Sequence, residues 1–168
     1  MLASIPDYLT YFAGLRRRTL AFGETLPADQ IDWSPGAGEF SCGDILRHIG
    51  AVQLMNWRAA AGQGWYYGGH EAGLGSSKAD ALAYLENCSQ QAHDMLKELP
   101  DEALHTKQPD LRGRPIAAWR YLMATVEHEI HHRSQLASYY YLMNIEPPQL
   151  YGVYMEDLPR DQGEHDEL

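Results

Sequence analysis

The sequence EHEIHHRSQ, residues 127–135, places three histidines and two glutamates in the middle of a long helical pattern. Because an α-helix turns about 100° per residue, His128 and His132 lie one turn apart on the same face. Two imidazoles at this spacing can bind one divalent metal ion. The alternative interpretation is a solvated helix with surface histidines. The stretch therefore indicates half of a metal site on a long helix.

Working outward, apolar residues recur at helical spacing in four segments, each bounded by residues that start and stop helices. The predicted helices run from Ser4 to about Leu26, from Ser41 to about Ala61, from Ser77 to about Leu99, and from Ile116 to about Met143, with Pro115 opening the last. No alternating apolar run is long enough to predict a strand. We therefore predict an all-α fold, a four-helix bundle.

The connections between these helices differ in length. Residues 62–75 hold six glycines and three aromatic residues, and we expect them to form a long crossover connection. Residues 101–114 are expected to be irregular. We predict one domain at residues 1–155, followed by an acidic, mobile tail at residues 156–168.

The charge balance excludes some partners. Thirteen Lys and Arg against twenty-three Asp and Glu give a net charge of -10, so we expect no nucleic-acid binding. The basic run Arg16–Arg18 is expected to be solvated. We predict a cytoplasmic protein, because the two cysteines are isolated and no signal peptide is visible. We expect no membrane contact, because no apolar run approaches the length of about 20 residues that a membrane span needs. We interpret the C-terminal letters HDEL, which resemble a retention signal, as coincidence.

A third metal ligand can be sought on the second predicted helix. His48 follows the spacing of Ile45, Val52 and Met55, an apolar stripe in which a lone histidine is more often a core residue than a ligand. Opposite a pair such as His128 and His132, however, His48 completes a three-histidine site that leaves positions open for water or substrate. Imidazole ligands indicate zinc or nickel, with iron or manganese as alternatives.

The fourth helix also supplies the expected surroundings of this site. On the face of His128 the sequence has aromatic residues at both ends and polar residues between them, as a pocket wall would: Tyr121, Thr125, Gln135 and Tyr139. His131 and Glu129 flank this face and are candidates for orienting a ligand. Arg133 is expected to face solvent or a partner chain.

The letters HEIHH at residues 128–132 also fit the HExxH pattern of zinc peptidases, in which the glutamate is the general base. An extended version of that motif needs glycine and histidine where Gln135 and Ser138 stand. The sequence also predicts no β-sheet portion that could bind an extended peptide substrate. The peptidase interpretation is therefore the weaker one.

Over roughly residues 5–155 the sequence resembles the DinB-like family, the damage-inducible four-helix metal proteins. The resemblance rests on four stretches: DILRHI at 44–49, Trp57, HEIHHRSQL at 128–136, and YYYLMNIEPPQLYG at 139–152. Ser134 stands where many members have glycine, which leaves the three histidines intact.

This resemblance implies a four-helix bundle whose metal ligands are His48, His128 and His132, often assembled as a homodimer. Some relatives are transferases that use low-molecular-weight thiols such as bacillithiol or mycothiol. The predicted function is therefore metal-dependent thiol (S-) transfer to a small-molecule substrate. One alternative is a metal-dependent hydrolase in which Glu129 is the catalytic base for water. The other is a non-catalytic, metal-binding stress-response protein.

Overall fold

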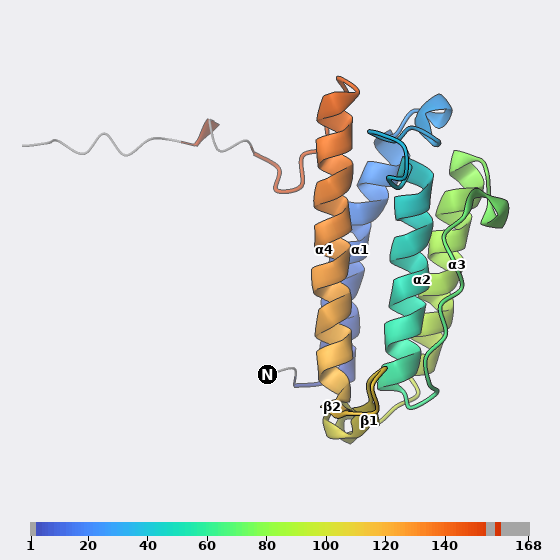
Figure 1. Cartoon of the computed structure of the whole chain (residues 1–168). Helices are drawn as coiled ribbons and strands as arrows, with labels where there is room; N and C mark the ends of the chain where they lie inside the picture. Colours follow the sequence, from blue (N-terminus) through green and yellow to red (C-terminus); the bar gives the residue numbers. More distant parts are fainter. Residues whose placement is uncertain (1–2, 154–156, 159–168) are drawn as a thin grey trace, which may run out of the picture.

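The computed structural model describes residues 3–153 and 157–158 of the chain. In this part, four α-helices form a bundle in which α1 and α4 run in one direction and α2 and α3 in the other (Figure 1). The helices are α1 (Ile5–Thr25), α2 (Cys42–Ala60), α3 (Lys78–Leu96) and α4 (Ala118–Leu142). Short 3-10 turns lie at Ala28–Gln30, Ala72–Leu74 and Asp101–His105. The prediction of an all-α four-helix bundle is confirmed.

Serine side chains start three of the helices, as the sequence predicts. Ser4 Oγ accepts a hydrogen bond from the Asp7 N–H at 3.1 Å at the start of α1. Ser41 and Ser77 form capping boxes, each with the aspartate three residues later. Because the first N–H groups of a helix have no partner within it, these caps define where the helices begin.

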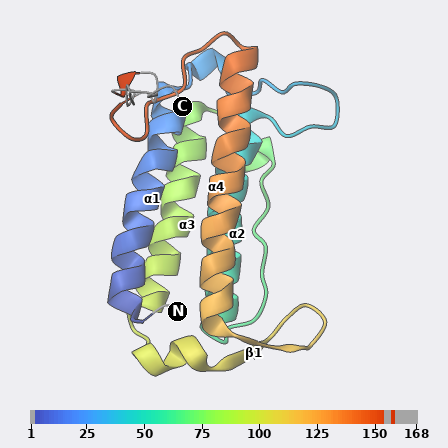
Figure 2. The ribbon, with the colours of Figure 1, turned by 90° about the vertical axis from the view of Figure 1, so that its left-hand side faces the viewer.

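The connection between α2 and α3 returns along the length of the bundle beside α2 (Figures 1 and 2). This path makes α2 and α3 parallel, and it is the crossover predicted from residues 62–75. Trp65 anchors the connection, since its Nε1–H donates to the Pro109 carbonyl at 3.0 Å. Arg47, buried on α2, donates to the carbonyls of His70 at 2.6 Å and Gly75 at 2.5 Å. The crossover is thereby fixed against α2.

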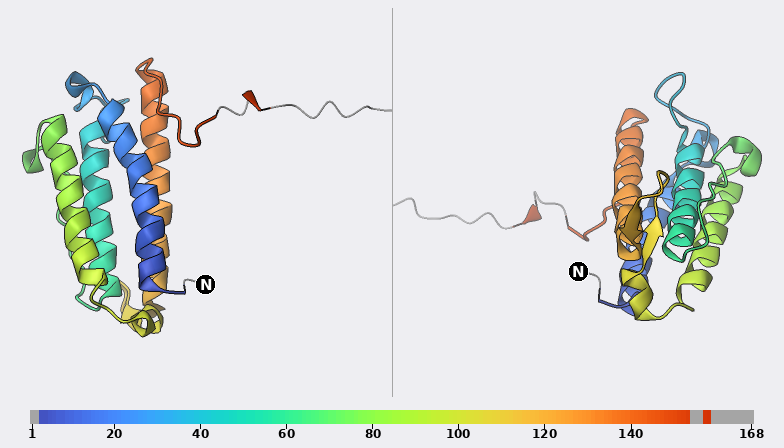
Figure 3. Two further views of the ribbon diagram at one scale, coloured as in Figure 1. Left: turned by 180° about the vertical axis from the view of Figure 1, so that it is seen from behind. Right: turned by 60° about the horizontal axis from the view of Figure 1, so that its bottom comes forward.

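The connection between α3 and α4 contains a hairpin that the sequence analysis did not predict. Strands β1 (Lys107–Pro109) and β2 (Pro115–Ala117) pair antiparallel at one end of the bundle (Figure 3). The Asp110 carboxylate closes the turn by accepting from the backbone N–H groups of Arg112 and Arg114, both at 2.8 Å. The prediction that Pro115 opens the fourth helix is therefore wrong: these three-residue strands are too short to produce a periodic pattern.

Two hydrophobic clusters fill the bundle, one near each end. One includes Tyr8, Phe12, Trp57 and Leu122, and the other includes Phe22, Ile45, Leu85 and Tyr140. Three of the four helices carry buried polar residues between the two clusters: Arg16 and Thr19 on α1, Gln53 on α2, and Glu129 and Arg133 on α4. We call these five residues the polar layer.

Arg16 and Arg133 correct two expectations. Arg16, in a run predicted to be solvated, is only 7% exposed, and it donates from Nε and Nη2 to the Glu129 carboxylate at 3.0 and 2.8 Å. Arg133, expected to face solvent or a partner, is buried and donates to the Leu15 carbonyl at 3.4 Å. A buried charge needs a partner on another helix, and a single helical pattern cannot show that partner.

Within the described residues, none of the helices has the length and apolar character needed to cross a membrane. The tail predicted at residues 156–168 lies outside the described residues, apart from Asp157 and Leu158.

Candidate metal centre

Three histidines from two helices come together at the middle of the bundle. His48 on α2 and His128 and His132 on α4 each offer a ring nitrogen, and these nitrogens lie within 4.8 Å of one another. The Nε2 atoms of His48 and His128 are 3.0 Å apart. The structure thus brings together the three residues that the sequence analysis selected as ligands.

A tyrosine from the crossover holds the far side of the His48 ring. The Tyr67 hydroxyl lies 2.7 Å from His48 Nδ1 and 2.7 Å from His70 Nδ1. Burial, with help from the charges of Glu71 and Asp44, raises the pKa of Tyr67 to about 12, so the hydroxyl keeps its proton at neutral pH. It can accept from His48 Nδ1–H while it donates to His70, which leaves the lone pair of His48 Nε2 free to bind a metal.

A glutamine performs the same task for His132. His132 Nδ1 lies 2.9 Å from Gln135 Oε1, and Gln135 Nε2 donates to the Tyr139 hydroxyl at 3.0 Å. Because an amide oxygen only accepts, Nδ1 of His132 carries the proton and its Nε2 is left as the ligand atom. Trp33 packs edge-on against Tyr139, with ring centroids 5.3 Å apart.

The electrostatics of the cluster suit a cation. Burial and the neighbouring imidazoles lower the pKa of His48 to about 4 and that of His128 to about 3, and burial also lowers the pKa of His132. All three rings are therefore neutral at pH 7, the form that binds metals. His128 Nδ1 is buried with no hydrogen-bond partner among the described residues, and its Nε2 faces that of His48. This donor set fits a divalent ion.

Glu129, expected as a catalytic base, is directed to a different helix. It is 1% exposed, and its carboxylate accepts from Arg16 at 3.0 and 2.8 Å and from Thr19 Oγ1 at 2.7 Å. It is not part of the group whose ligand atoms lie within 4.8 Å. The structure therefore engages this carboxylate with α1 and does not bring it to the histidines.

The remaining residues predicted to line the pocket divide into two sets. Gln135 and Tyr139 extend from His132, as described. Tyr121 instead donates to the Gln108 carbonyl at 3.3 Å, and Thr125 is buried and donates back to the Tyr121 carbonyl at 2.9 Å. His131 is exposed, with its ring centroid 4.9 Å from that of His132. No hydrogen bond joins Tyr121, Thr125 or His131 to the three histidines in the described structure.

The sequence analysis missed Tyr67, His70 and Phe40. Phe40 packs against the rings of His48 and His70, with centroid distances of 5.2 and 4.4 Å. His70 lies in the glycine-rich stretch 62–75, where no helical spacing relates it to His48. One signal was available: a histidine and three aromatic residues stand in a connection long enough to pass along α2. Which residues of α2 they contact depends on the path of the connection, which the sequence does not show.

The fold and the three imidazoles define a helical-bundle protein with a candidate three-histidine metal centre. The chain matches the DinB superfamily over residues 11–136, and it belongs to that family.

Two solved structures share the fold. A DinB-like protein from Bacillus cereus aligns with a TM-score of 0.75 at 20% identity, covering 92% of this chain and 100% of that one. A DinB-like protein from Bacillus subtilis aligns with a TM-score of 0.66 at 21% identity, covering 86% of this chain and 96% of that one. A comparison with curated proteins finds no match.

Proposed function

We propose that this protein binds one divalent metal ion through the Nε2 atoms of His48, His128 and His132, and that the bound ion serves thiol chemistry on a small molecule. The observation that carries the proposal is the convergence of three neutral imidazoles, two of which are held from behind by Tyr67 and Gln135. Zinc and nickel suit this donor set, and iron and manganese are the alternatives to test.

Three histidine ligands leave coordination positions open, and an ion held in this way lowers the pKa of a thiol or a water that reaches it. The chain's own cysteines are poor candidates for the nucleophile. Cys42 and Cys88 are both buried, and burial raises the pKa of Cys42 to about 12 and also raises that of Cys88. A reactive thiol therefore has to come from a separate small molecule.

The engagement of Glu129 favours thiol transfer over hydrolysis. Water activation needs a base near the centre, and both oxygens of this carboxylate accept hydrogen bonds from α1. A thiol has a much lower pKa than water, so it needs less help in losing its proton. The task left to the chain is to hold the imidazoles in position, which Tyr67 and Gln135 do.

Metal binding is tested by stripping the protein with a chelator and titrating zinc, nickel, iron(II) and manganese by calorimetry. We expect one ion per chain, with binding lost in His48→Ala and His132→Ala. His131→Ala is the matched control, since this exposed histidine lies on the same helix outside the group. Equal binding by wild type and His132→Ala would contradict the proposed ligand set.

The reaction is tested by incubating the metal-loaded protein with a panel of low-molecular-weight thiols and an electrophile such as chlorodinitrobenzene or fosfomycin. We expect metal-dependent S-conjugate with at least one thiol, and none with His128→Ala. Intact metal binding without a conjugate from any thiol would contradict thiol transfer and favour a non-catalytic metal protein. Metal-dependent cleavage of model esters in the same samples would favour a hydrolase.

We also propose that the chain forms a homodimer. Tyr141 and Leu142, at the end of α4, are 71% and 66% exposed. The two residues adjoin in the sequence, and contiguous exposed apolar surface often marks a contact between proteins. Light scattering is expected to give twice the mass of one chain, and Tyr141→Ser with Leu142→Ser is expected to reduce it to one.

A further inference from the structure

A cavity lies away from His48, His128 and His132, between α1, α2 and α3. Its volume is about 170 Å³, and its apolar lining includes Leu9, Phe12 and Trp57. Its polar groups come from Arg16, Gln53, Ser89 and His93. Nothing in the proposed thiol chemistry uses this space, because His48, His128 and His132 lie on α2 and α4 and none of them lines it.

Three buried N–H donors of residues that line this cavity have no partner in the described parts of the chain: Arg16 Nη1, Gln53 Nε2 and Trp57 Nε1. Arg16 uses Nε and Nη2 for Glu129, and Nη2 also donates to Gln53 Oε1 at 2.7 Å. That contact uses the Oε1 atom of the Gln53 amide and directs its Nε2 away from Arg16 Nη2. Arg16 Nη1 and Gln53 Nε2 are both buried, and neither has a hydrogen-bond partner in the described parts of the chain. Their residues are 7% and 1% exposed. Buried donors without acceptors destabilise a fold, so Arg16 Nη1 and Gln53 Nε2 together favour an incoming oxygen atom.

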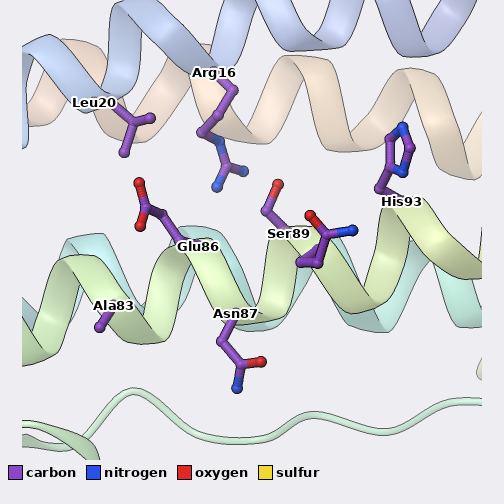
Figure 4. Close-up of a pocket in the computed structure, with 8 residues that line it drawn as sticks. Arg16, Leu20, Ala83, Glu86, Asn87, Ser89 and His93 are labelled. Carbon is purple, nitrogen blue, oxygen red and sulfur yellow. The ribbon is translucent and has the colours of Figure 1, made fainter.

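The cavity adjoins an open groove between α1 and α3, with which it shares Arg16, Ser89 and His93. Figure 4 shows Arg16 reaching from α1 towards α3, while Glu86, Ser89 and His93 project from α3 towards α1. The groove has a volume of about 590 Å³. The groove is therefore the side from which a small molecule would approach the cavity.

The charges favour a neutral ligand. The positive charge of Arg16 is already balanced by the Glu129 carboxylate 2.8 Å away. An anion that accepts from Arg16 Nη1 would be repelled by the nearby Glu129 carboxylate, whereas Arg133, the other buried cation of the polar layer, does not line the cavity. Glu86 in the outer groove adds to the repulsion. A carbonyl or amide oxygen accepts the two hydrogen bonds without this penalty.

We propose that the cavity between α1, α2 and α3 is a binding site for a small neutral molecule that presents a carbonyl-type oxygen to Arg16 Nη1 and Gln53 Nε2. The apolar part of the ligand packs against Phe12 and Trp57, whose rings meet edge-to-face at a centroid distance of 5.0 Å. The cavity volume equals that of about five or six water molecules. It therefore suits a ligand with one ring and a short substituent.

The test uses the full chain labelled with ¹⁵N and three probes of similar shape: acetophenone, cumene and benzoate. Acetophenone has the ring and the oxygen, cumene has the ring alone, and benzoate adds a charge. We expect acetophenone to shift the side-chain NH₂ signals of Gln53 and the indole N–H of Trp57 saturably, with cumene and benzoate at least tenfold weaker. Because the site is independent of the metal, the same shifts are expected after chelation.

A cavity-filling variant provides the control for location. Ser89→Leu places a larger side chain in the cavity without altering either donor, and it is expected to abolish the acetophenone shifts. Ala13→Leu fills the cavity from α1 should the first variant fail to fold. Ser138→Leu, an exposed serine on α4, is the matched substitution and should bind like wild type.

Three results would overturn the proposal. Equal affinity for cumene would show a merely apolar cavity. Tighter binding of benzoate would show an anion site. Unchanged Gln53 NH₂ signals up to the solubility limit of acetophenone would show that ordered water alone satisfies the donors.

Discussion

The Tyr67 hydroxyl decides which nitrogen of His48 can bind a metal. It bridges the Nδ1 atoms of His48 and His70, at 2.7 Å from each. Without a hydrogen-bond partner at either nitrogen, a neutral imidazole carries its proton on Nδ1 part of the time and on Nε2 for the rest. The bridge fixes the proton on Nδ1 and directs Nε2 to the other histidines.

Replacing Tyr67 by Phe is therefore expected to weaken metal binding by about 10–100-fold, the usual effect of losing a partner behind a metal ligand. Calorimetric titration of zinc into wild type and variant measures the change. Tyr66→Phe is the control, because Tyr66 is a neighbouring exposed tyrosine whose ring lies 5.9 Å from the Arg58 guanidinium instead. Identical affinities for Tyr67→Phe and wild type would show that the bridge does not orient His48.

Glu129 illustrates how a residue can match a motif and do something else. In HEIHH it stands where a peptidase has its general base, and this match predicts a catalytic residue. In the fold it receives three hydrogen bonds from Arg16 and Thr19 on α1. Its side chain leaves α4 about 100° from that of His128, which is enough to reach a different helix.

Glu129→Gln should reduce the free energy of unfolding by about 3–5 kcal/mol, because it leaves the Arg16 charge buried without its partner. Urea unfolding monitored by circular dichroism measures the loss. Glu127→Gln, an exposed neighbour on the same helix, should change stability little. Full loss of activity with unchanged stability would instead restore Glu129 to a catalytic role.

At the scale of the helices, the start of α2 carries a pH-dependent contact. Burial acts to raise the pKa of Asp44, but hydrogen bonds from the Ser41 N–H at 3.0 Å and from Arg47 Nη2 at 2.8 Å outweigh it. The pKa of Asp44 is therefore lower in the folded chain than in the unfolded one. A carboxyl with a lowered pKa stabilises the fold fully above its unfolded pKa, and that contribution disappears as the pH falls through the folded pKa.

The variant Asp44→Asn should consequently be less stable than wild type at pH 7, and the difference should shrink as the pH falls below about 4. Urea unfolding of both proteins between pH 7 and pH 3 gives the difference at each pH. Asp7→Asn is the control for removing a charge from a first helical turn. A difference that stays constant to pH 3 would show that the Asp44 charge does not contribute.

The helices were predictable because their signals are local. Ser41 and Ser77 cap them, apolar residues repeat along them, and the position of His48 relative to Ile45 follows from one helix alone. The hairpin at 107–117 and the burial of Arg16 were not predictable in this way. The strands of the hairpin are three residues each, too short for a periodic pattern, and the burial of Arg16 depends on its contact with Glu129, which is far away in the sequence.

At the scale of the whole molecule, the polar layer and the histidines occupy the same level of the bundle. Glu129 adjoins His128 in sequence, so α4 contacts α1 through an ion pair on one side and α2 through imidazoles on another. The two hydrophobic clusters lie on either side of this level. A sliding of α4 by one turn would break both sets of polar contacts, whereas apolar contacts alone would tolerate it better. The histidine centre therefore lies where the alignment of the helices is most strictly defined.

Metal binding should stabilise the whole bundle, because the three ligands join α2 to α4 and come together only in the folded chain. At a free metal concentration 100 times Kd, mass action adds about 2.7 kcal/mol to the free energy of unfolding. For a chain of this length that corresponds to a rise in Tm of roughly 5–10 °C. Calorimetric melting with and without zinc measures the shift, which His131→Ala should retain and His132→Ala should lose. A rise in Tm of the same size in His132→Ala would mean that the ion binds elsewhere, and the abundant carboxylates are the first candidates. The stabilisation by zinc would then not come from the histidine centre.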